Sequence, residues 1–337
     1  MSEAFGVAVV QRRPVFLNLE ATLERAEESI AEAAAGGARI VAFGETWLTG
    51  YPAWIDSAPG AAIWDSAPAR ALYARLFRQS PTIDGPELER LHRAAHEHDC
   101  DVVMGLHERR GNTLYNAIVS LSRDGTTRAL RRKLVPTYTE RMIWGVGDGS
   151  TLDVLATPHG NVGAMICWEH WMPALRQVMH AHGEVVHVAQ WPAGHDLHQL
   201  ASRQYAFEGG CFVLCCGTPL TKGDMIEGYR SLGEDAGLEL LEAIPGDDAT
   251  ALLSGNSAII APDTSYVVGP VGSDEQIVRA TIDPARCDEA RLKLDVDGHY
   301  SRPDLFTLEV DTRERGNVET NDAAPGQVGS TRRHAAG

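Results

Sequence analysis

Residues 5–43 read FGVAVVQRRPVFLNLEATLERAEESIAEAAAGGARIVAF, and this stretch decides the fold class. Its first part, Phe5–Gln11, is a short apolar run that predicts a strand. Asn18 can cap a helix, and the apolar side chains after it recur at helical spacing until the glycine pair 36–37 ends the pattern. Arg39–Phe43 predicts a second, buried strand. The order strand, helix, strand indicates a β-α-β unit with parallel strands and a right-handed crossover.

Further along the chain, helical patterns alternate with strands and hairpins, which predicts a mixed α/β fold and not a doubly wound one. The expected helices are Ala67–Gln79, Pro86–Glu97, Pro173–Ala181, Leu197–Glu208 and one that begins at Asp283-Pro284. The expected strands are Asp101–His107, Leu114–Ser122, Thr127–Val135, Val185–Gln190, Cys211–Cys216, Ser257–Ala261, Tyr266–Val268 and Gln276–Ile282.

The chain carries no linker that would divide it, so we expect residues 1–311 to form a single domain. Two stretches, Ala53–Ala69 and Gly233–Ser254, look like surface insertions because their apolar residues lack periodicity. Residues 312–337 are rich in Gly, Asn, Asp, Ala and Pro, which predicts a largely disordered tail.

The composition, 44% hydrophobic and 23% charged among 337 residues, is typical of a soluble globular protein. The net charge of −16 argues against nucleic acid or an anionic membrane as the main partner, since both attract basic surfaces. One local basic patch is expected from Arg128, Arg131, Arg132 and Lys133. No apolar run approaches the roughly 20 residues of a membrane span, and no signal peptide is visible. The six cysteines lack framework or metal-ligand spacing, which favours a reducing cytoplasm.

The most informative chemical feature is the stretch NVGAMICWEHWMP at residues 161–173. An apolar run ends in Cys167, and after a short turn Pro173 can open a helix. We therefore expect a strand-to-helix elbow that exposes the thiol at a sheet edge, near backbone N–H groups that favour a thiolate. The alternative is a buried structural cysteine, and the choice depends on whether a base and an oxyanion donor exist elsewhere.

Three further residues can supply that chemistry. Glu45 stands just past the second strand, where ligands of α/β proteins bind, and is a candidate general base. Lys133 is a candidate to stabilise an oxyanion, and Glu140 is a second carboxylate. The alternative for Glu140 is a simple ion pair with Arg141.

The sequence resembles the nitrilase branch of the nitrilase superfamily of carbon–nitrogen hydrolases, from about Phe5 to Asp311. Glu45, Lys133 and Cys167 occur in the order and local context of that family. The segments that carry the resemblance are GETWLTGYP at 44–52, RKLVPT at 132–137, ICWEHWMP at 166–173, VAQWP at 188–192 and GHYSRPD at 298–304.

The resemblance implies an α-β-β-α sandwich of two mixed sheets with outer helices. It also implies a homo-oligomer, either a dimer or a larger spiral, and the two suspected insertions fall where the nitrilase branch builds oligomer contacts. The implied partner is a small-molecule nitrile, and neither a metal ion nor an organic cofactor is expected.

The resemblance also assigns roles. Glu45 takes the proton of the Cys167 thiol, and the sulfur attacks the nitrile carbon to give a thioimidate and then a thioester. Lys133 and the backbone N–H of Trp168 stabilise the developing charge, while Glu140 supports Lys133 or water. Trp168, Tyr51 and Trp191 are candidates for the pocket wall, although core packing explains each of them equally well. Glu169 and His170 receive no catalytic step.

Two other functions remain open at this point. A cyanide-processing or amide-forming hydrolase would use the same four residues, because the tetrahedral adduct can expel sulfur in place of ammonia. A catalytically silent assembly protein is a different class, but assembly alone would not require this set of residue types.

Overall fold

The computed structural model describes residues 3–316, in which two six-stranded sheets pack face to face. The first sheet has the order β14-β1-β2-β3-β4-β5, and its parallel core is formed by β1, β2 and β3. The bounds of its strands are β1 Phe5–Gln11, β2 Ala38–Ala42, β3 Asp101–Arg110, β4 Thr113–Leu121, β5 Arg128–Arg132 and β14 Gln276–Ile282.

The second sheet has the order β13-β12-β9-β8-β7-β6, with β7, β8 and β9 parallel. Its strands are β6 Leu155–Thr157, β7 Gly160–Ile166, β8 Glu184–Gln190, β9 Phe212–Cys216, β12 Ala258–Ile260 and β13 Tyr266–Val268. A small separate pair is formed by β10 (Pro219–Thr221) and β11 (Ala251–Ser254).

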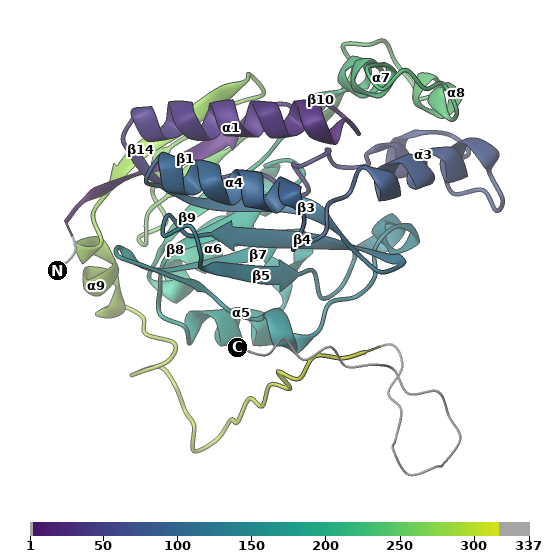
Figure 1. The fold of residues 1–337 in the computed structure, drawn as a ribbon. Coiled ribbons are helices and arrows are strands. Elements are labelled where there is room, and N and C mark those ends of the chain that lie inside the picture. Colours follow the sequence, from purple (N-terminus) through teal and green to yellow (C-terminus); the bar gives the residue numbers. More distant parts are fainter. Residues whose placement is uncertain (1–2, 317–337) are drawn as a thin grey trace, which may run out of the picture.

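Alternate side chains of each strand point into different layers of the sandwich. In β1, Val7 and Val9 point into the core between the sheets, whereas Ala8 and Val10 point into the core beneath the outer helices α1 (Leu19–Ala35) and α4 (Pro86–Glu97). Figure 1 shows α1 and α4 lying together over this sheet.

The other outer layer is formed by α5 (Pro173–His180) and α6 (Asp196–Gly209), whose apolar residues join the core of the second sheet. This arrangement confirms the predicted α-β-β-α sandwich of two mixed sheets. A short helix, α9 (Ala285–Arg291), follows β14 as expected from Asp283-Pro284. None of the helices among the described residues is long and apolar enough to cross a bilayer.

The stretches Ala53–Ala69 and Gly233–Ser254 include exposed residues such as Trp64, as a surface insertion should, but they also bury apolar side chains. They contribute to a third hydrophobic core, which includes the buried side chains of Trp54, Leu72 and Leu241. The helices around this core are α2 (Trp54–Ser57), α3 (Ala67–Arg78), α7 (Lys222–Arg230) and α8 (Leu238–Glu242), and α3, α7 and α8 project beyond the sheets in Figure 1. Sequence periodicity missed this core because each segment supplies only a few apolar residues, and the segments meet only in the fold.

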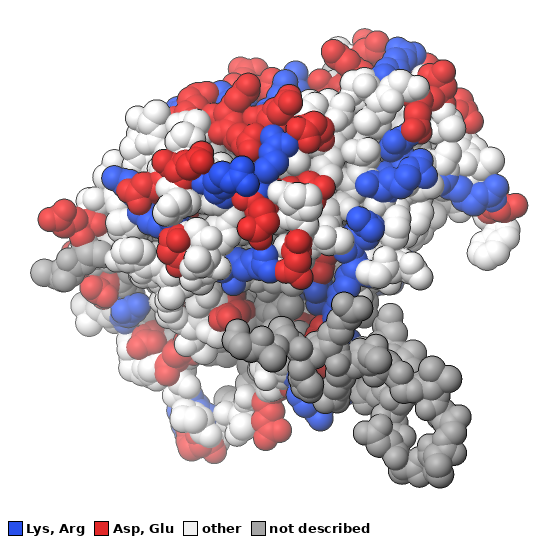
Figure 2. All heavy atoms as spheres, viewed as in Figure 1, with Lys and Arg blue, Asp and Glu red and all other residues white. Residues whose placement is uncertain are grey.

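The predicted basic patch is also absent from the surface of the described residues. Arg131, Arg132 and Lys133 are all buried, and each of them pairs with a buried carboxylate. Figure 2 shows acidic and basic side chains intermixed on the face over α1 and α4. The basic run therefore belongs to the interior.

Most of the predicted disordered tail, residues 317–337, lies outside the described residues. Its first residues are described, and they lie against the body of the protein. Glu314 forms an ion pair with Arg110, and the backbone N–H of Arg315 donates to Asp148 at 2.7 Å.

The two sheets are tied together at the ends of their strands, next to Glu45. Gln190, the last residue of β8, donates from Nε2 to the carbonyl of Phe43 at 2.9 Å. Gly105 in β3 makes room for this contact, because a Cβ there would lie 2.1 Å from the carbonyl oxygen of Gly44 and 2.7 Å from the Gln190 side chain. The backbone that carries Glu45 is therefore held by packing from both sheets.

Gly105→Ala should lower the free energy of unfolding by roughly 1–3 kcal/mol, the usual cost of overpacking, because the added methyl group must displace backbone. Urea unfolding of the purified protein measures this. Gly111→Ala is the control: Gly111 has a positive φ of 59° but no neighbour within 4 Å, so only backbone strain of about 1 kcal/mol is expected. Equal losses in the two variants would contradict the packing argument.

Candidate active site

Cys167 lies in a strained turn at the end of β7. Its φ of +54° is in the left-handed region, which is uncommon for a residue with a side chain and is found at functional sites. A 3₁₀ helix, Cys167–Trp171, begins at this turn, and the backbone N–H of Trp168 acts to lower the pKa of the thiol. The predicted elbow is therefore present, but the thiol is buried and not exposed at the sheet edge as predicted.

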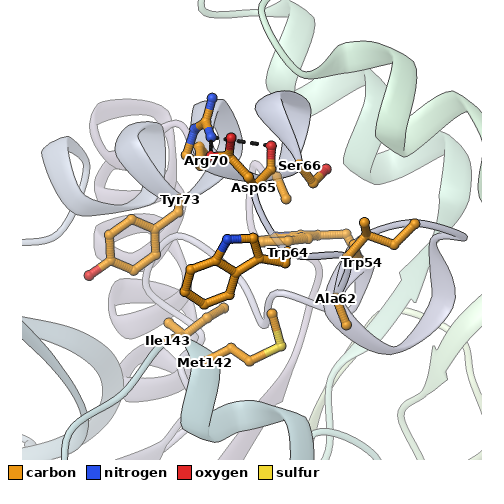
Figure 3. A pocket seen from close by; sticks show the side chains of 12 residues that line it. Trp54, Ala62, Trp64, Asp65, Ser66, Arg70, Tyr73, Met142 and Ile143 are labelled. Atoms are coloured by element: carbon orange, nitrogen blue, oxygen red, sulfur yellow. Dashed lines mark hydrogen bonds and ion pairs between the residues drawn. The ribbon is translucent and has the colours of Figure 1, made fainter.

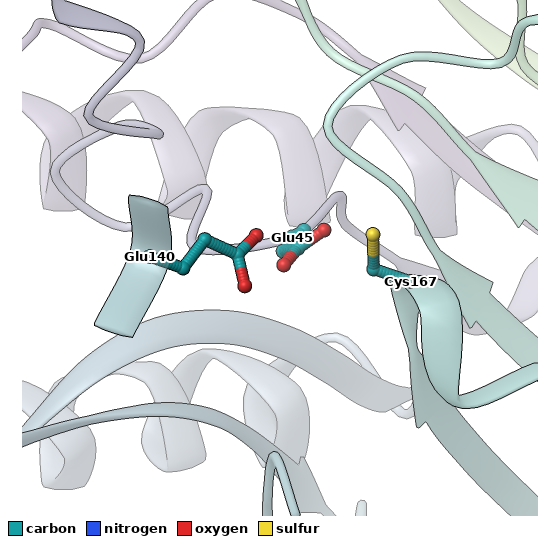
Figure 4. A group of neighbouring side chains, drawn as sticks. All are labelled: Glu45, Glu140 and Cys167. Atoms are coloured by element: carbon teal, nitrogen blue, oxygen red, sulfur yellow. The ribbon is translucent and has the colours of Figure 1, made fainter. Parts of the chain in front are cut away.

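The structure brings Glu45, Lys133, Glu140 and Cys167 together in one buried cluster. Glu45 follows β2, Lys133 follows β5, Glu140 lies in the 3₁₀ helix Tyr138–Met142, and Cys167 follows β7. Lys133 Nζ donates to Glu45 Oε1 at 2.9 Å and to Glu140 Oε2 at 2.7 Å. Figure 4 shows Glu45 between Glu140 and Cys167. Both sheets thus contribute to a single site.

Glu45 has one bonded and one free oxygen. Its Oε1 accepts from Lys133 and from Nδ2 of Asn116, at 2.7 Å, whereas Oε2 has no partner among the described residues. Burial raises the pKa of Glu45 to about 7; attraction to Lys133 opposes the rise and repulsion from Glu140 adds to it. A carboxylate with a free oxygen and a pKa near neutrality suits a general base.

Glu140 is the fully bonded member of the pair of carboxylates. Besides Lys133, it accepts from the backbone N–H of Thr137 at 2.6 Å and from the hydroxyl of Tyr51 at 3.0 Å. Arg141 instead donates to the carbonyl of Pro136, so the alternative of a Glu140–Arg141 ion pair is excluded. Glu140 therefore anchors Lys133, while Glu45 keeps one oxygen free.

The charge states of the thiol and the amine follow from burial and from one another. Burial disfavours a charge on Lys133, but attraction to Cys167 when that thiol is ionised, and to Glu45 and Glu140, outweighs it and raises the Lys133 pKa. Burial and the nearby Glu45 raise the pKa of the Cys167 thiol well above its usual range, with Lys133 opposing. We expected the turn to favour a thiolate; instead the resting group is a neutral thiol that needs a base.

The cluster also has the composition of a metal site. One ligand atom each from Glu45, Glu140 and Cys167 lie within 4.8 Å of one another. Lys133, however, already bonds to both carboxylates and supplies the positive charge that a metal ion would otherwise bring. The residues present thus form a self-contained charge cluster.

Two further residues support the site: Asn116, which was not identified from the sequence, and Glu169, which was given no catalytic step. Asn116 in β4 orients Glu45, and its carbonyl accepts from the backbone N–H of Lys133 at 2.8 Å. Glu169 accepts from the backbone N–H groups of Leu134 at 2.7 Å and of Ile166 at 3.0 Å. It thereby joins the residue after Lys133 to the residue before Cys167. The sequence signal that could have identified Glu169 is an acidic residue two positions after the nucleophile.

The three predicted pocket aromatics lie in different surroundings. Tyr51 is bonded to Glu140, and Trp168 is 39% exposed beside the nucleophile. Trp191 has no exposed surface, and its indole N–H donates to the Ser202 hydroxyl at 3.1 Å. Trp191 is stacked on His170, three residues after the nucleophile, and its place in the pocket wall stays a prediction.

A cavity of about 660 Å³ is lined in part by Met142 and Ile143, which follow Glu140 in the chain. Figure 3 shows the indole of Trp64 above Met142 and Ile143, with Tyr73 to one side. Cys167 is not part of its lining. This cavity is therefore separate from the nucleophile, although Ile143 is only three residues from Glu140.

Glu169→Gln should lower both stability and turnover, because an amide has one acceptor oxygen where the carboxylate serves three donors, including Arg131 at 2.8 Å. Breaking a buried ion pair typically costs roughly 3–5 kcal/mol. Urea unfolding and steady-state kinetics measure the two effects. Glu208→Gln on α6 is the control. The Glu208 side chain, which pairs with Arg176, is 24% exposed, so this change should lower the free energy of unfolding by less. A Glu169→Gln variant with unaltered stability would contradict the proposed link between the two segments.

Comparison with known proteins agrees with this fold and site. Residues 6–292 match the family model described as carbon–nitrogen hydrolase. The chain is 38% identical over 320 residues to a protein named nitrilase 2 from an unknown prokaryotic organism, covering 94% of this chain and 95% of the relative. It is 37% identical to an aliphatic nitrilase of Sinorhizobium fredii, covering 94% and 98%.

Among solved structures, the NitFhit protein of C. elegans has a similar fold, with a TM-score of 0.68 at 18% identity, covering 94% of this chain and 69% of that one. The family match spans most of the described residues and includes all four members of the buried cluster. The chain therefore belongs to the carbon–nitrogen hydrolase family, and its similarity to nitrilases places it in the nitrilase branch.

Proposed function

We propose that this protein is a nitrilase that converts an organic nitrile to a carboxylic acid and ammonia. The observation that carries the proposal is the buried cluster in which a thiol, a free carboxylate oxygen and an ammonium group converge. The relatives named nitrilases, at 37–38% identity over more than nine-tenths of this chain, support the same function.

The first step follows from the protonation states. Glu45 accepts the thiol proton on its free oxygen as the Cys167 sulfur bonds to the nitrile carbon. One electron pair of the triple bond moves to nitrogen, and the charge is stabilised by Lys133 and the backbone N–H of Trp168. Lys133 donates a proton to this nitrogen, which gives a neutral thioimidate, and the proton that Glu45 took from the thiol restores the Lys133 ammonium.

The later steps use water twice. Water adds to the thioimidate carbon, and expulsion of ammonia from the tetrahedral adduct leaves a thioester. Glu45 then activates a second water, which displaces the sulfur and releases the acid. Expulsion of sulfur at the first adduct would release an amide instead, so the same residues also support an amide-forming reaction.

The remaining assignments belong to this proposal. Glu140 holds Lys133 in place, Tyr51 and the exposed Trp168 contact the organic part of the substrate, and no metal or organic cofactor takes part. We further propose that the protein is a homo-oligomer, a dimer or a larger spiral, as its family membership implies, and that it acts in the cytoplasm, which the six unpaired cysteines of the described residues favour.

Cys167→Ala should abolish turnover and leave the fold intact, because it removes the only atom that forms the covalent bond. The variant is assayed with a panel of aliphatic, aryl and arylacetonitriles, scored for ammonia, acid and amide. Cys100→Ala is a matched control, since Cys100 is also a buried free thiol but precedes β3. Turnover near wild type in Cys167→Ala would refute the proposal, and amide without ammonia would replace it by the amide-forming reaction.

The pH dependence should show the base. Glu45 is active as the carboxylate, so kcat/KM should fall as pH drops through about 7, where burial places its pKa. Because Glu45, Lys133 and Cys167 interact strongly, the apparent pKa on the acidic side of the pH profile belongs to the whole cluster and not to Glu45 alone. The measurement is kcat/KM against pH for one good substrate. An acidic limb near the ordinary glutamate value of 4.5 would contradict the role given to burial.

A further inference from the structure

A chain of buried polar side chains runs from the nucleophile turn into the second sheet, and the catalytic steps above do not use it. His170 Nδ1 lies 2.8 Å from the carbonyl oxygen of Cys167, and its Nε2 lies 3.1 Å from Nε2 of His187. His187 Nδ1 lies 3.0 Å from Oε1 of Glu184, whose Oε2 accepts from the hydroxyl of Tyr205 at 2.6 Å. All four side chains are at most 2% exposed.

The direction of these hydrogen bonds is fixed at one end. A carbonyl oxygen can only accept, so Nδ1 of His170 must carry a hydrogen. If His170 is neutral, its Nε2 is then an acceptor, and Nε2 of His187 must carry the hydrogen of the second link. Nδ1 of a neutral His187 is in turn an acceptor, so the third link needs a hydrogen from Glu184.

Counting hydrogens leads to the same result. The three links, from the Cys167 carbonyl to Glu184, require three hydrogens, and two neutral imidazoles supply only two. The third comes from a protonated Glu184, or else His170 is an imidazolium and Glu184 a carboxylate. Burial lowers the pKa values of His170 and His187 well below their usual range and raises that of Glu184 to about 7, which favours the neutral form.

The first link acts on the peptide that serves the reaction. The Cys167 carbonyl and the Trp168 N–H belong to one planar peptide unit, so a bond that holds the carbonyl also aims the N–H. That N–H acts to lower the pKa of the thiol and, under the proposed function, stabilises the nitrogen on which charge develops. Cys167 sits in a strained turn, which would relax without such a constraint.

We propose that His170, His187 and Glu184 are positioning residues for the nitrilase reaction, and that a proton kept on Glu184 lets the chain hold the Cys167–Trp168 peptide in its reactive orientation. This inference rests on the proposed function for its catalytic consequence but not for the protonation of Glu184. Loss of that proton leaves two hydrogens for three hydrogen bonds, so one of the three must break, and this can be the bond from His170 to the Cys167 carbonyl.

The surroundings of Glu184 allow it to respond to pH. Its carboxyl fills the space above Gly163 in β7, where a Cβ would lie 1.4 Å from Oε1. Besides His187, the titratable groups that face it are Tyr205 on α6, His180 and His182 at the end of α5, and Cys211 before β9. Positive charge on His180 or His182 would favour its ionisation, whereas burial opposes ionisation more strongly.

Glu184→Gln tests the inference directly. A glutamine amide donates to His187 and accepts from Tyr205, as a protonated carboxyl does, but does not titrate. We expect wild-type kcat to decline above about pH 7 as Glu184 ionises, whereas Glu184→Gln retains most of the wild-type maximum without that decline. Glu184→Leu has no donor and should lower kcat by about 10-fold to 100-fold at every pH, which is less than the roughly 100-fold to 1000-fold loss caused by removing an oxyanion donor outright.

A second pair of variants isolates the bond to the carbonyl. In His170→Asn the side-chain amide lies where Nδ1 lay and still donates to the Cys167 carbonyl, without the link to His187. In His170→Phe the donor is absent. We expect His170→Asn to recover most of the kcat that His170→Phe loses, with KM altered less than kcat and with no alkaline decline due to Glu184. Equal losses in the two variants would overturn the positioning role.

Thermal unfolding tests the proton independently of activity. A raised pKa means that the folded state binds the extra proton between pH 4.5 and about 7, so this group loses stabilising effect as pH rises through that window. The unfolding midpoint of Glu184→Gln should therefore rise relative to wild type across that window. If the midpoint of Glu184→Gln instead lies below that of wild type by an amount that stays constant or grows as pH rises, Glu184 is ionised and paired with an imidazolium. That result would refute the inference, whatever reaction the protein catalyses.

Discussion

The ammonium group of Lys133, held between the carboxylates of Glu45 and Glu140, is the interaction on which the site depends. None of these three side chains is more than 4% exposed, so each charge relies on the others for the stabilisation that water would provide. One cation between two acids leaves the cluster short of positive charge. This shortage, together with burial, keeps the pKa of Glu45 near neutrality and makes it able to exchange a proton with the Cys167 thiol.

The fold meets this requirement by bringing four strand ends or turns to one place. Glu45 and Lys133 come from the first sheet and Cys167 from the second, and contacts that cross between the sheets hold them in register. Gln190 reaches the backbone beside Glu45, and Glu169 reaches the backbone beside Lys133. Small displacements of either sheet would separate the thiol from its base, which explains why so many buried polar groups surround the site without touching the reacting atoms.

Much of the fold could be predicted because its signals are local. Phe5–Gln11, Pro86–Glu97 and Gln276–Ile282 have the bounds expected from periodicity and punctuation. The third core could not be predicted, because Trp54 and Leu241 meet only after the chain has folded. In the site, sequence context identified Cys167, Glu45, Lys133 and Glu140 as candidates, and the structure brings them together.

The protonation states of these four residues could not be predicted from the sequence. A helix start next to Cys167 suggested a thiolate, but burial and the charge on Glu45 have the larger effect on the thiol pKa. Burial likewise places the basic run at 131–133 in the interior and not at the surface. These properties depend on desolvation, which is a sum over neighbours distant in sequence.

The most direct test of the account is to stop the reaction with acid during turnover of a nitrile and measure the mass of the intact protein, followed by peptide mapping. The account predicts a single added acyl or imidoyl group, located on Cys167 and absent from the other five cysteines. Turnover without any covalent adduct, or an adduct on a different residue, would contradict it.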